Sequence, residues 1–164
     1  MQDKSQPVGR QSEVTLREIN KETVGAVCRL SVTDDQRQFV AANAYSIAQA
    51  HFEEKAWFRA IYADETPVGF IMLYDDPDEP TYFLWRLMID HRYQKHGFGR
   101  RAVERLIDYV KTRPDADSLL VSHGQGEGSP AGFYQRLGFV YTGEVDDGEL
   151  VMKLSFDSAN AAGA

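Results

Sequence analysis

The feature that most constrains the fold is a buried strand that leads through a glycine-containing loop directly into an amphipathic helix. Residues 81–89 form a nearly continuous apolar and aromatic run, which is typical of a central strand covered on both faces. Apolar residues then recur at helical spacing through 98–111. Between the two, Gly97 and Gly99 lack Cβ atoms, so the loop can turn sharply and a ligand can approach its N–H groups. The start of such a helix favours an anion, for example a diphosphate.

Alternating and helical patterns predict the other elements around this unit. In chain order they are a strand at 14–19, helices at 23–31 and 34–54 (the second with a break near Asn43), strands at 58–62 and 68–74, an acidic loop at 75–80, a strand at 117–122, a helix at 130–137, and strands at 139–145 and 150–156. This order predicts an α/β (α+β) fold in which a mixed sheet carries helices on its faces.

The length and composition favour one domain. The chain has 164 residues, and between its polar ends no linker or change in composition divides it. We therefore expect a domain at 13–156, with a flexible N-terminal tail at 1–12 and a flexible C-terminal tail at 157–164. Cys28 lies in an apolar helical pattern and is expected to be a small core residue.

Charge and hydropathy exclude several classes of partner and location. A net charge of -7 argues against a general nucleic-acid binder, which needs clustered cations for the phosphates. No apolar run approaches the roughly 18 residues of a membrane span. The first eleven residues contain no apolar segment of a secretory signal, and one cysteine fits a reducing compartment. These features predict a cytoplasmic protein that binds neither nucleic acid nor membranes.

Two motifs resemble those of the GNAT N-acetyltransferase superfamily. Residues 94–99, Gln-Lys-His-Gly-Phe-Gly, are similar to its acetyl-CoA motif, Gln/Arg-x-x-Gly-x-Gly/Ala. Residues 131–139, Ala-Gly-Phe-Tyr-Gln-Arg-Leu-Gly-Phe, are similar to its later helix and following strand. The order of elements also matches across 13–156. The resemblance implies a GNAT fold with about six or seven strands, a splay between the central strands, and acetyl-CoA as cosubstrate, with no metal.

The resemblance also implies where acetyl-CoA and the catalytic group lie. The diphosphate of CoA is expected on the loop amides and the pantetheine arm along the central strand. The cofactor-binding residues implied are Leu87, Met88, Ile89, Gln94, Lys95, His96, Gly97, Phe98, Gly99 and Arg100. Arg101 is expected to add charge near the same anion. Tyr134 matches the family tyrosine whose hydroxyl protonates or stabilises the departing thiolate. The implied reaction is direct attack of an amine on the thioester.

The group that removes a proton from the amine stays open. In many family members a glutamate on the central strand has this role, but Trp85 and Arg86 stand about there in this chain. His91 and His96 are interpreted as loop residues, and His123, after a strand, remains a candidate.

The acceptor is expected to be a small-molecule amine. Residues 39–54, 68–72 and 85–90 resemble the bacterial diamine/polyamine (spermine/spermidine) acetyltransferase branch. Carboxylates of Glu53, Glu54 and the loop 75–79 could hold a polycation, or could simply be solvated. Aromatic side chains that could line its path are those of Tyr45, Trp57 and Trp85. The alternatives are an amino-acid, antibiotic or protein amine, or a non-catalytic acyl-CoA-binding sensor. The resemblance implies a homodimer.

Overall fold

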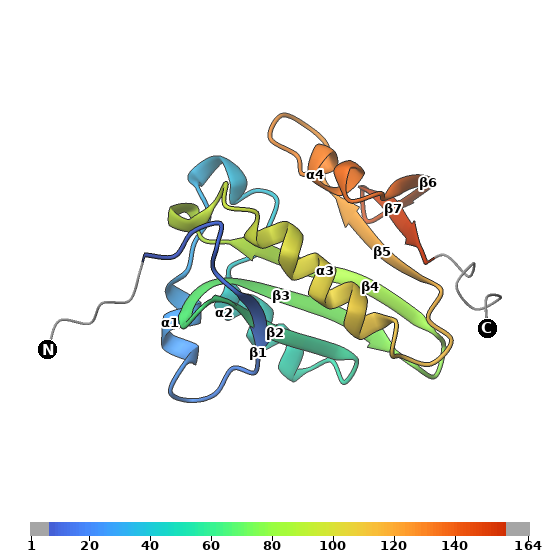
Figure 1. Ribbon diagram of the computed structural model, residues 1–164. Coiled ribbons are helices and arrows are strands. Elements are labelled where there is room, and N and C mark those ends of the chain that lie inside the picture. The colour runs from blue at the N-terminus through green and yellow to red at the C-terminus, as the bar shows by residue number, and fades with distance from the viewer. Residues whose placement is uncertain (1–6, 157–164) are drawn as a thin grey trace, which may run out of the picture.

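The computed structural model describes residues 7–156 (Figure 1). The elements are β1 (Val14–Arg17), α1 (Val24–Arg29), the 3-10 helix η1 (Asp34–Gln36), α2 (Asn43–His51), β2 (Ala56–Ala63), β3 (Thr66–Asp76), β4 (Thr81–Ile89), the 3-10 helix η2 (His91–Tyr93), α3 (Phe98–Val110), β5 (Ser118–His123), α4 (Ala131–Arg136), β6 (Val140–Asp146) and β7 (Glu149–Ser155). The predicted order of strands and α-helices is confirmed.

The seven strands form one mixed sheet in the order β1-β2-β3-β4-β5-β7-β6. All neighbours pair antiparallel except β4 and β5, which pair parallel. Helix α3 crosses one face of the sheet, and α1 and α2 cover the other (Figure 1). The predicted α+β fold is therefore confirmed.

Each face of the sheet has its own apolar cluster. On one side, α3 buries Phe98 and Leu106 against strands β2 to β5. On the other, Val27 of α1 packs with Phe70 and Met88. Burying side chains of this size contributes about 1.5–3 kcal/mol each, so both helical layers are firmly attached to the sheet.

The predicted helix at 34–54 is largely wrong in its first half. Only η1 and α2 are helical, and the residues between them are not. Helix α2 begins at Asn43, where the break was expected, and the buried side-chain amide of Asn43 donates a 2.9 Å hydrogen bond to the carbonyl of Val27. Cys28 is exposed on α1 while its neighbour Val27 is buried, so the prediction of a core cysteine is also wrong.

The predicted N-terminal tail is partly folded onto the domain. Residues 1–6 and the predicted tail at 157–164 lie outside the described residues. Within 7–12, Ser12 is buried, and its carbonyl accepts a 2.6 Å hydrogen bond from the guanidinium of Arg101 on α3. Val8 also packs against the core. The domain therefore begins earlier than the apolar pattern indicates.

Candidate active site

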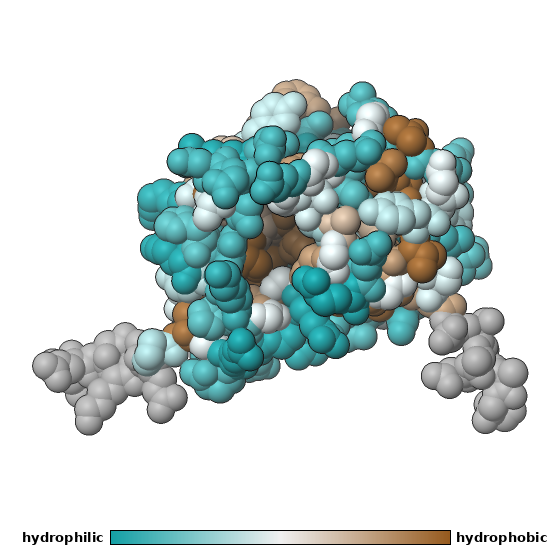
Figure 2. Space-filling model, turned by 90° about the horizontal axis from the view of Figure 1, so that it is seen from above, coloured by the Kyte–Doolittle hydropathy of each residue, from teal (hydrophilic) through white to brown (hydrophobic). Residues whose placement is uncertain are grey.

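A cleft of about 1530 Å³ opens where β4 and β5 separate. In the space-filling view its interior is apolar and its rim is mostly hydrophilic (Figure 2). Small-molecule sites commonly measure about 300–1,000 Å³. This cleft therefore has room for more than one small substrate.

The separation of the two strands exposes main-chain groups along β4. The strands pair only through Phe83 with Leu120 and Leu84 with Val121. Beyond these pairs β4 continues to Ile89, and its edge toward β5 has no strand partner. Free N–H and C=O groups on a strand edge can pair with an extended amide chain.

A bulge in β4 shapes the middle of the cleft. Arg86 pairs with Met72 and Leu84 with Leu73, so Trp85 has no partner on β3. The side chains of both Trp85 and Arg86 line the cleft. Bulges redirect side chains in this way near functional sites.

The loop between β4 and α3 provides N–H donors at one end of the cleft. Gly97 precedes α3 with φ of 80°, and no side chain caps the helix. The first backbone hydrogen bond of α3 joins the amide of Arg101 to the carbonyl of Gly97. The preceding N–H groups, including those of Phe98 and Gly99, are therefore available to an anion, which the helix dipole also favours.

Side chains around this loop fix its shape and add charge. The amide of Gln94 donates to the carbonyl of Ile89 at 2.9 Å and to Gln36 at 2.8 Å. Lys95 and Arg100 line the cleft. Arg101 does not, because its guanidinium bonds the carbonyls of Ser12 and His96 instead. The structure therefore does not bring Arg101 into the cleft with Lys95 and Arg100.

Nine of the ten residues predicted to bind acetyl-CoA line this one cleft. They are Leu87, Met88, Ile89, Gln94, Lys95, Gly97, Phe98, Gly99 and Arg100. His96 does not line it. Phe98 contributes its backbone, since its ring is buried in the core below α3.

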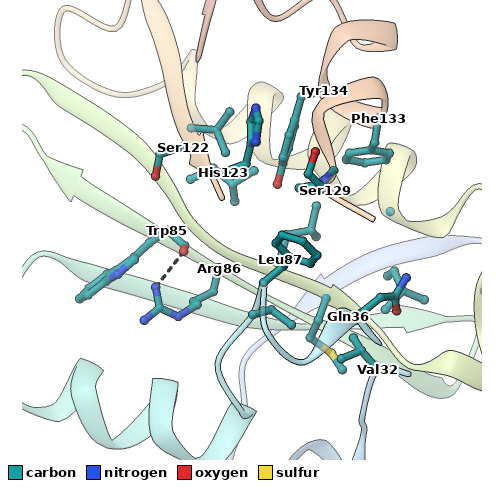
Figure 3. Close-up of a pocket in the computed structure, with 18 of the residues that line it drawn as sticks. Val32, Gln36, Trp85, Arg86, Leu87, Ser122, His123, Ser129, Phe133 and Tyr134 are labelled. Atoms are coloured by element: carbon teal, nitrogen blue, oxygen red, sulfur yellow. Dashed lines mark hydrogen bonds between the residues drawn. The ribbon is translucent and has the colours of Figure 1, made fainter. Parts of the chain in front are cut away.

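Tyr134 lies on the wall opposite β4 (Figure 3). Its ring is held edge-on by Phe133 and Phe139, and its hydroxyl end points into the cleft. Burial, and then the negative charge of Glu149, raise the pKa of Tyr134. The phenol therefore stays protonated at neutral pH and can donate a hydrogen bond.

Both ring nitrogens of His123 have hydrogen-bond partners within the protein. Its Nδ1 lies 2.8 Å from the carbonyl of Gly124, and its Nε2 lies 3.0 Å from the hydroxyl of Tyr141. A carbonyl only accepts, so we assign the proton to Nδ1 and the Tyr141 hydroxyl as donor to Nε2. This leaves no free lone pair for an incoming amine. His91 is exposed and outside the cleft.

Glu149 is a cleft residue that the sequence pattern did not reveal. Its carboxylate accepts a 2.6 Å hydrogen bond from Ser122, and both residues line the cleft. Glu149 reaches this position because β7 pairs with β5 through Leu150 and His123. The sequence around Glu149 contains no motif that predicts this position, because the pairing of β7 with β5 determines it.

Of the four residues predicted to bind the acceptor, only Trp85 lines the cleft. Tyr45 is 61% exposed on α2, and Glu53 accepts a hydrogen bond from the amide of Lys55. Glu54 lies beside a separate, smaller pocket. Tyr45, Glu53 and Glu54 therefore do not meet at the cleft as expected.

The predicted acidic loop is also not a free cluster of carboxylates. Asp75 and Asp76 belong to β3. Asp75 binds the guanidinium of Arg113 at 2.9 Å, and Asp76 lies 3.1 Å from the ammonium of Lys55. Trp57, expected near the acceptor, instead stacks on Tyr109. These carboxylates already have cationic partners.

Two structural absences bear on cofactors and location. Across residues 7–156, no group of three or more His, Cys, Asp or Glu side chains is arranged to hold a metal ion. Within the same range, no helix has the length and hydrophobicity needed to cross a membrane.

Comparison with known proteins shows which sequences and folds are similar. The sequence model of the Acetyltransferase (GNAT) family matches residues 26–139. A spermine/spermidine N(1)-acetyltransferase of Bacillus subtilis (strain 168) is 26% identical over 85% of this chain and 96% of its own length.

Two solved structures share the fold at low sequence identity. The PaiA N-acetyltransferase of Thermoplasma acidophilum, in complex with coenzyme A, has a TM-score of 0.65 at 16% identity, covering 88% of this chain and 99% of its own. A GNAT family acetyltransferase of Elizabethkingia anophelis with acetyl-CoA bound has a TM-score of 0.64 at 12% identity, covering 88% and 97%.

Proposed function

The chain belongs to the acetyltransferase (GNAT) family, whose members use acetyl-CoA, and we propose that it acetylates a primary amine of a small molecule. The observation that carries this proposal is the cleft between β4 and β5. Its unpaired strand edge leads to the free N–H groups at the start of α3, and Tyr134 faces that edge from the other wall.

Different residues of the cleft are assigned to different parts of acetyl-CoA. We assign the pantetheine arm to the backbone of Leu87, Met88 and Ile89, which offers strand-type hydrogen bonds. The diphosphate is assigned to the amides at the start of α3, with Lys95 and Arg100 supplying positive charge. Acetyl-CoA supplies an activated acyl group, and we assign its thioester to the part of the cleft beside the bulge of β4.

Tyr134 is the residue we assign to the leaving group. When the amine forms the new C–N bond, the C–S bond breaks and its electron pair stays on sulfur. A thiol has an ordinary pKa of about 8.5, below the raised pKa of Tyr134. The phenol therefore stabilises the thiolate as a hydrogen-bond donor, and it need not lose its proton. The ammonium proton must leave by another route.

For the acceptor, we propose a polyamine as the more specific class. Its support is the resemblance to the spermine/spermidine N(1)-acetyltransferase. In this chain the acidic residues that line the cleft lie at the tip of the β6–β7 hairpin, namely Asp146, Asp147 and Glu149. They would attract a polycation, whereas Glu53 and Glu54 lie elsewhere.

The proposal is tested by measuring CoA release from acetyl-CoA with a panel of amines. The panel contains spermine, spermidine, putrescine, lysine, an aminoglycoside and a short peptide. Release with at least one amine is expected. Thermal stabilisation by acetyl-CoA without release would favour the acyl-CoA-binding sensor. No stabilisation and no release would overturn the assignment of the cleft.

A homodimer and a cytoplasmic location complete the proposal. The strand β6 lies at the edge of the sheet, with Val140 at 64% and Val145 at 62% exposed. Exposed apolar side chains on an edge strand support pairing with a second copy. Size-exclusion chromatography with light scattering tests the dimer, and cell fractionation tests the location.

A further inference from the structure

Arg86 is a charged residue of the cleft, and acetyl transfer to a simple amine does not require it. It lies at the bulge of β4, on the wall opposite Ser122 and Tyr134 (Figure 3). Its side chain is partly buried and lines the cleft. A cation here would repel a polyamine, because like charges disfavour each other at close range.

The hydrogen bonds of Arg86 leave its positive charge unbalanced. Nη1 donates to the carbonyl of Trp85 at 3.0 Å, and Nη2 donates to the side-chain oxygen of Gln49 at 3.1 Å. Both acceptors are neutral. Nε is buried and has no partner among residues 7–156, and no ion pair in that range includes Arg86.

Burial makes this arrangement unfavourable without an anion. Loss of solvent lowers the pKa of Arg86, while the negative charge of Glu149 acts in the opposite direction. Glu149 does not form an ion pair with Arg86, and its carboxylate is already bonded to Ser122. A buried cation is stable when an anion completes its hydrogen bonds.

The surroundings also hold the guanidinium in a fixed orientation. Gln49 anchors one side, and the ring of Trp85 lies 5.4 Å from the guanidinium carbon. Arginine has five N–H donors, and two of them are used here. Nη1 and Nη2 each keep a further N–H, and a planar guanidinium can donate two parallel hydrogen bonds to a carboxylate.

We propose that Arg86 binds a carboxylate carried by the amine acceptor, so that the acceptor is an amino-acid-type molecule. This inference rests on the proposed acetyl transfer and names its acceptor class. The carboxylate anchors the acceptor at the β4 wall. Glu149, on the opposite side at the start of β7, supplies the negative charge that an ammonium group needs.

The experiment compares acceptors that differ only by the carboxylate. The matched pairs are lysine and cadaverine, ornithine and putrescine, methionine and 3-methylthiopropylamine, and phenylalanine and phenethylamine. CoA release is measured for the wild type, Arg86→Gln and Arg86→Lys. Arg29→Gln is the control, because Arg29 is an exposed arginine on α1 outside the cleft.

The wild type is expected to prefer the carboxylate-bearing member of at least one pair. Arg86→Gln should lower kcat/KM for that member about 100-fold and change its partner less than about threefold. Arg86→Lys should restore part of the loss, and Arg29→Gln should match the wild type. Equal use of both members, turnover of spermine and spermidine alone, or an unchanged preference in Arg86→Gln would overturn the inference.

A binding measurement separates this inference from the proposed reaction. Calorimetric titration of the CoA-saturated protein with each pair measures the carboxylate preference without turnover. If no amine is acetylated but the amino acid binds and Arg86→Gln abolishes binding, the reaction is wrong and the anion site stands. If acetylation occurs without a carboxylate preference in either measurement, the reaction stands and the anion site is wrong.

Discussion

The hydroxyl of Ser122 on β5 donates a 2.6 Å hydrogen bond to the carboxylate of Glu149 at the start of β7. This bond holds a carboxylate at the wall of the cleft, close enough for its charge to raise the pKa of Tyr134. Glu149 therefore lies close to Tyr134, the residue assigned to the leaving thiolate. Its carboxylate is also a candidate to accept the proton that the amine must lose.

Glu149→Gln is expected to lower kcat at neutral pH by about 10- to 100-fold, because a neutral amide cannot accept the proton that the protonated amine must lose before it attacks. The amide keeps the shape of the side chain and can still accept a hydrogen bond from Ser122. Ser122→Ala is the matched variant and should have a smaller effect. Steady-state rates from pH 6 to 9 provide the measurement. Equal rates for Glu149→Gln and the wild type would remove Glu149 from this role.

Tyr134→Phe should lower kcat by about 100-fold while acetyl-CoA binds with nearly unchanged affinity. The ring keeps its contacts with Phe133 and Phe139, so only the hydrogen bond to sulfur is lost. Single-turnover kinetics and calorimetric titration with acetyl-CoA separate the two effects. A variant that turns over at the wild-type rate would show that the leaving group needs no donor from Tyr134.

Gly97→Ala should lower the free energy of unfolding by about 1 kcal/mol, because its φ of 80° is unfavourable for a residue with a Cβ atom. Space is not the cause, since no atom lies within 4 Å of an added Cβ. Gly99→Ala is the control: its Cβ would meet Phe133 at 3.5 Å, an ordinary contact. Urea unfolding of both variants measures the difference. Equal destabilisation would contradict the role of φ.

Tyr109→Phe should flatten the alkaline stability profile. The Tyr109 hydroxyl donates to Asp75 at 2.7 Å, and burial together with this bond raises its pKa to about 12. An unfolded tyrosine titrates near about 10. Above that pH the unfolded chain releases a proton that the folded protein keeps, so the free energy of unfolding falls as pH rises toward 12.

Urea unfolding at pH 8 to 11 compares the slopes of the two proteins. Tyr82 also has a raised pKa and contributes equally to both, so the difference isolates Tyr109. Parallel profiles for the wild type and Tyr109→Phe would contradict the assignment.

The parts of the fold that local pattern determines were predictable. The helical stripe of 98–111 and the apolar run of 81–89 each report burial of a single element, and both are found within a residue of the expected bounds. The loop motif likewise predicted six cleft residues, because its glycines and their neighbours are adjacent in the sequence.

The predictions that were wrong concern residues whose positions depend on contacts between segments far apart in the sequence. The sequence around Asp75 is typical of a loop, but Asp75 belongs to β3 and pairs with Tyr82. Its carboxylate also binds the distant side chains of Tyr109 and Arg113. Glu53 and Glu54 were predicted to lie at the end of a helix beside the acceptor. Helix α2 ends at His51, before these residues, and neither of them lines the cleft. Glu149 reaches the site only through the pairing of β5 and β7. Pairings of this kind leave no local trace in composition or periodicity.

The two residue pairs that join β4 to β5 also have a mechanical consequence. Among residues 7–156 they are the only ladder between the N-terminal strands and the unit formed by β5, β6 and β7. A ligand laid in the gap acts as an additional strand and joins the two parts of the sheet. Amide hydrogens of β5 should therefore exchange more slowly once acetyl-CoA is bound, and the sheet should unfold more cooperatively.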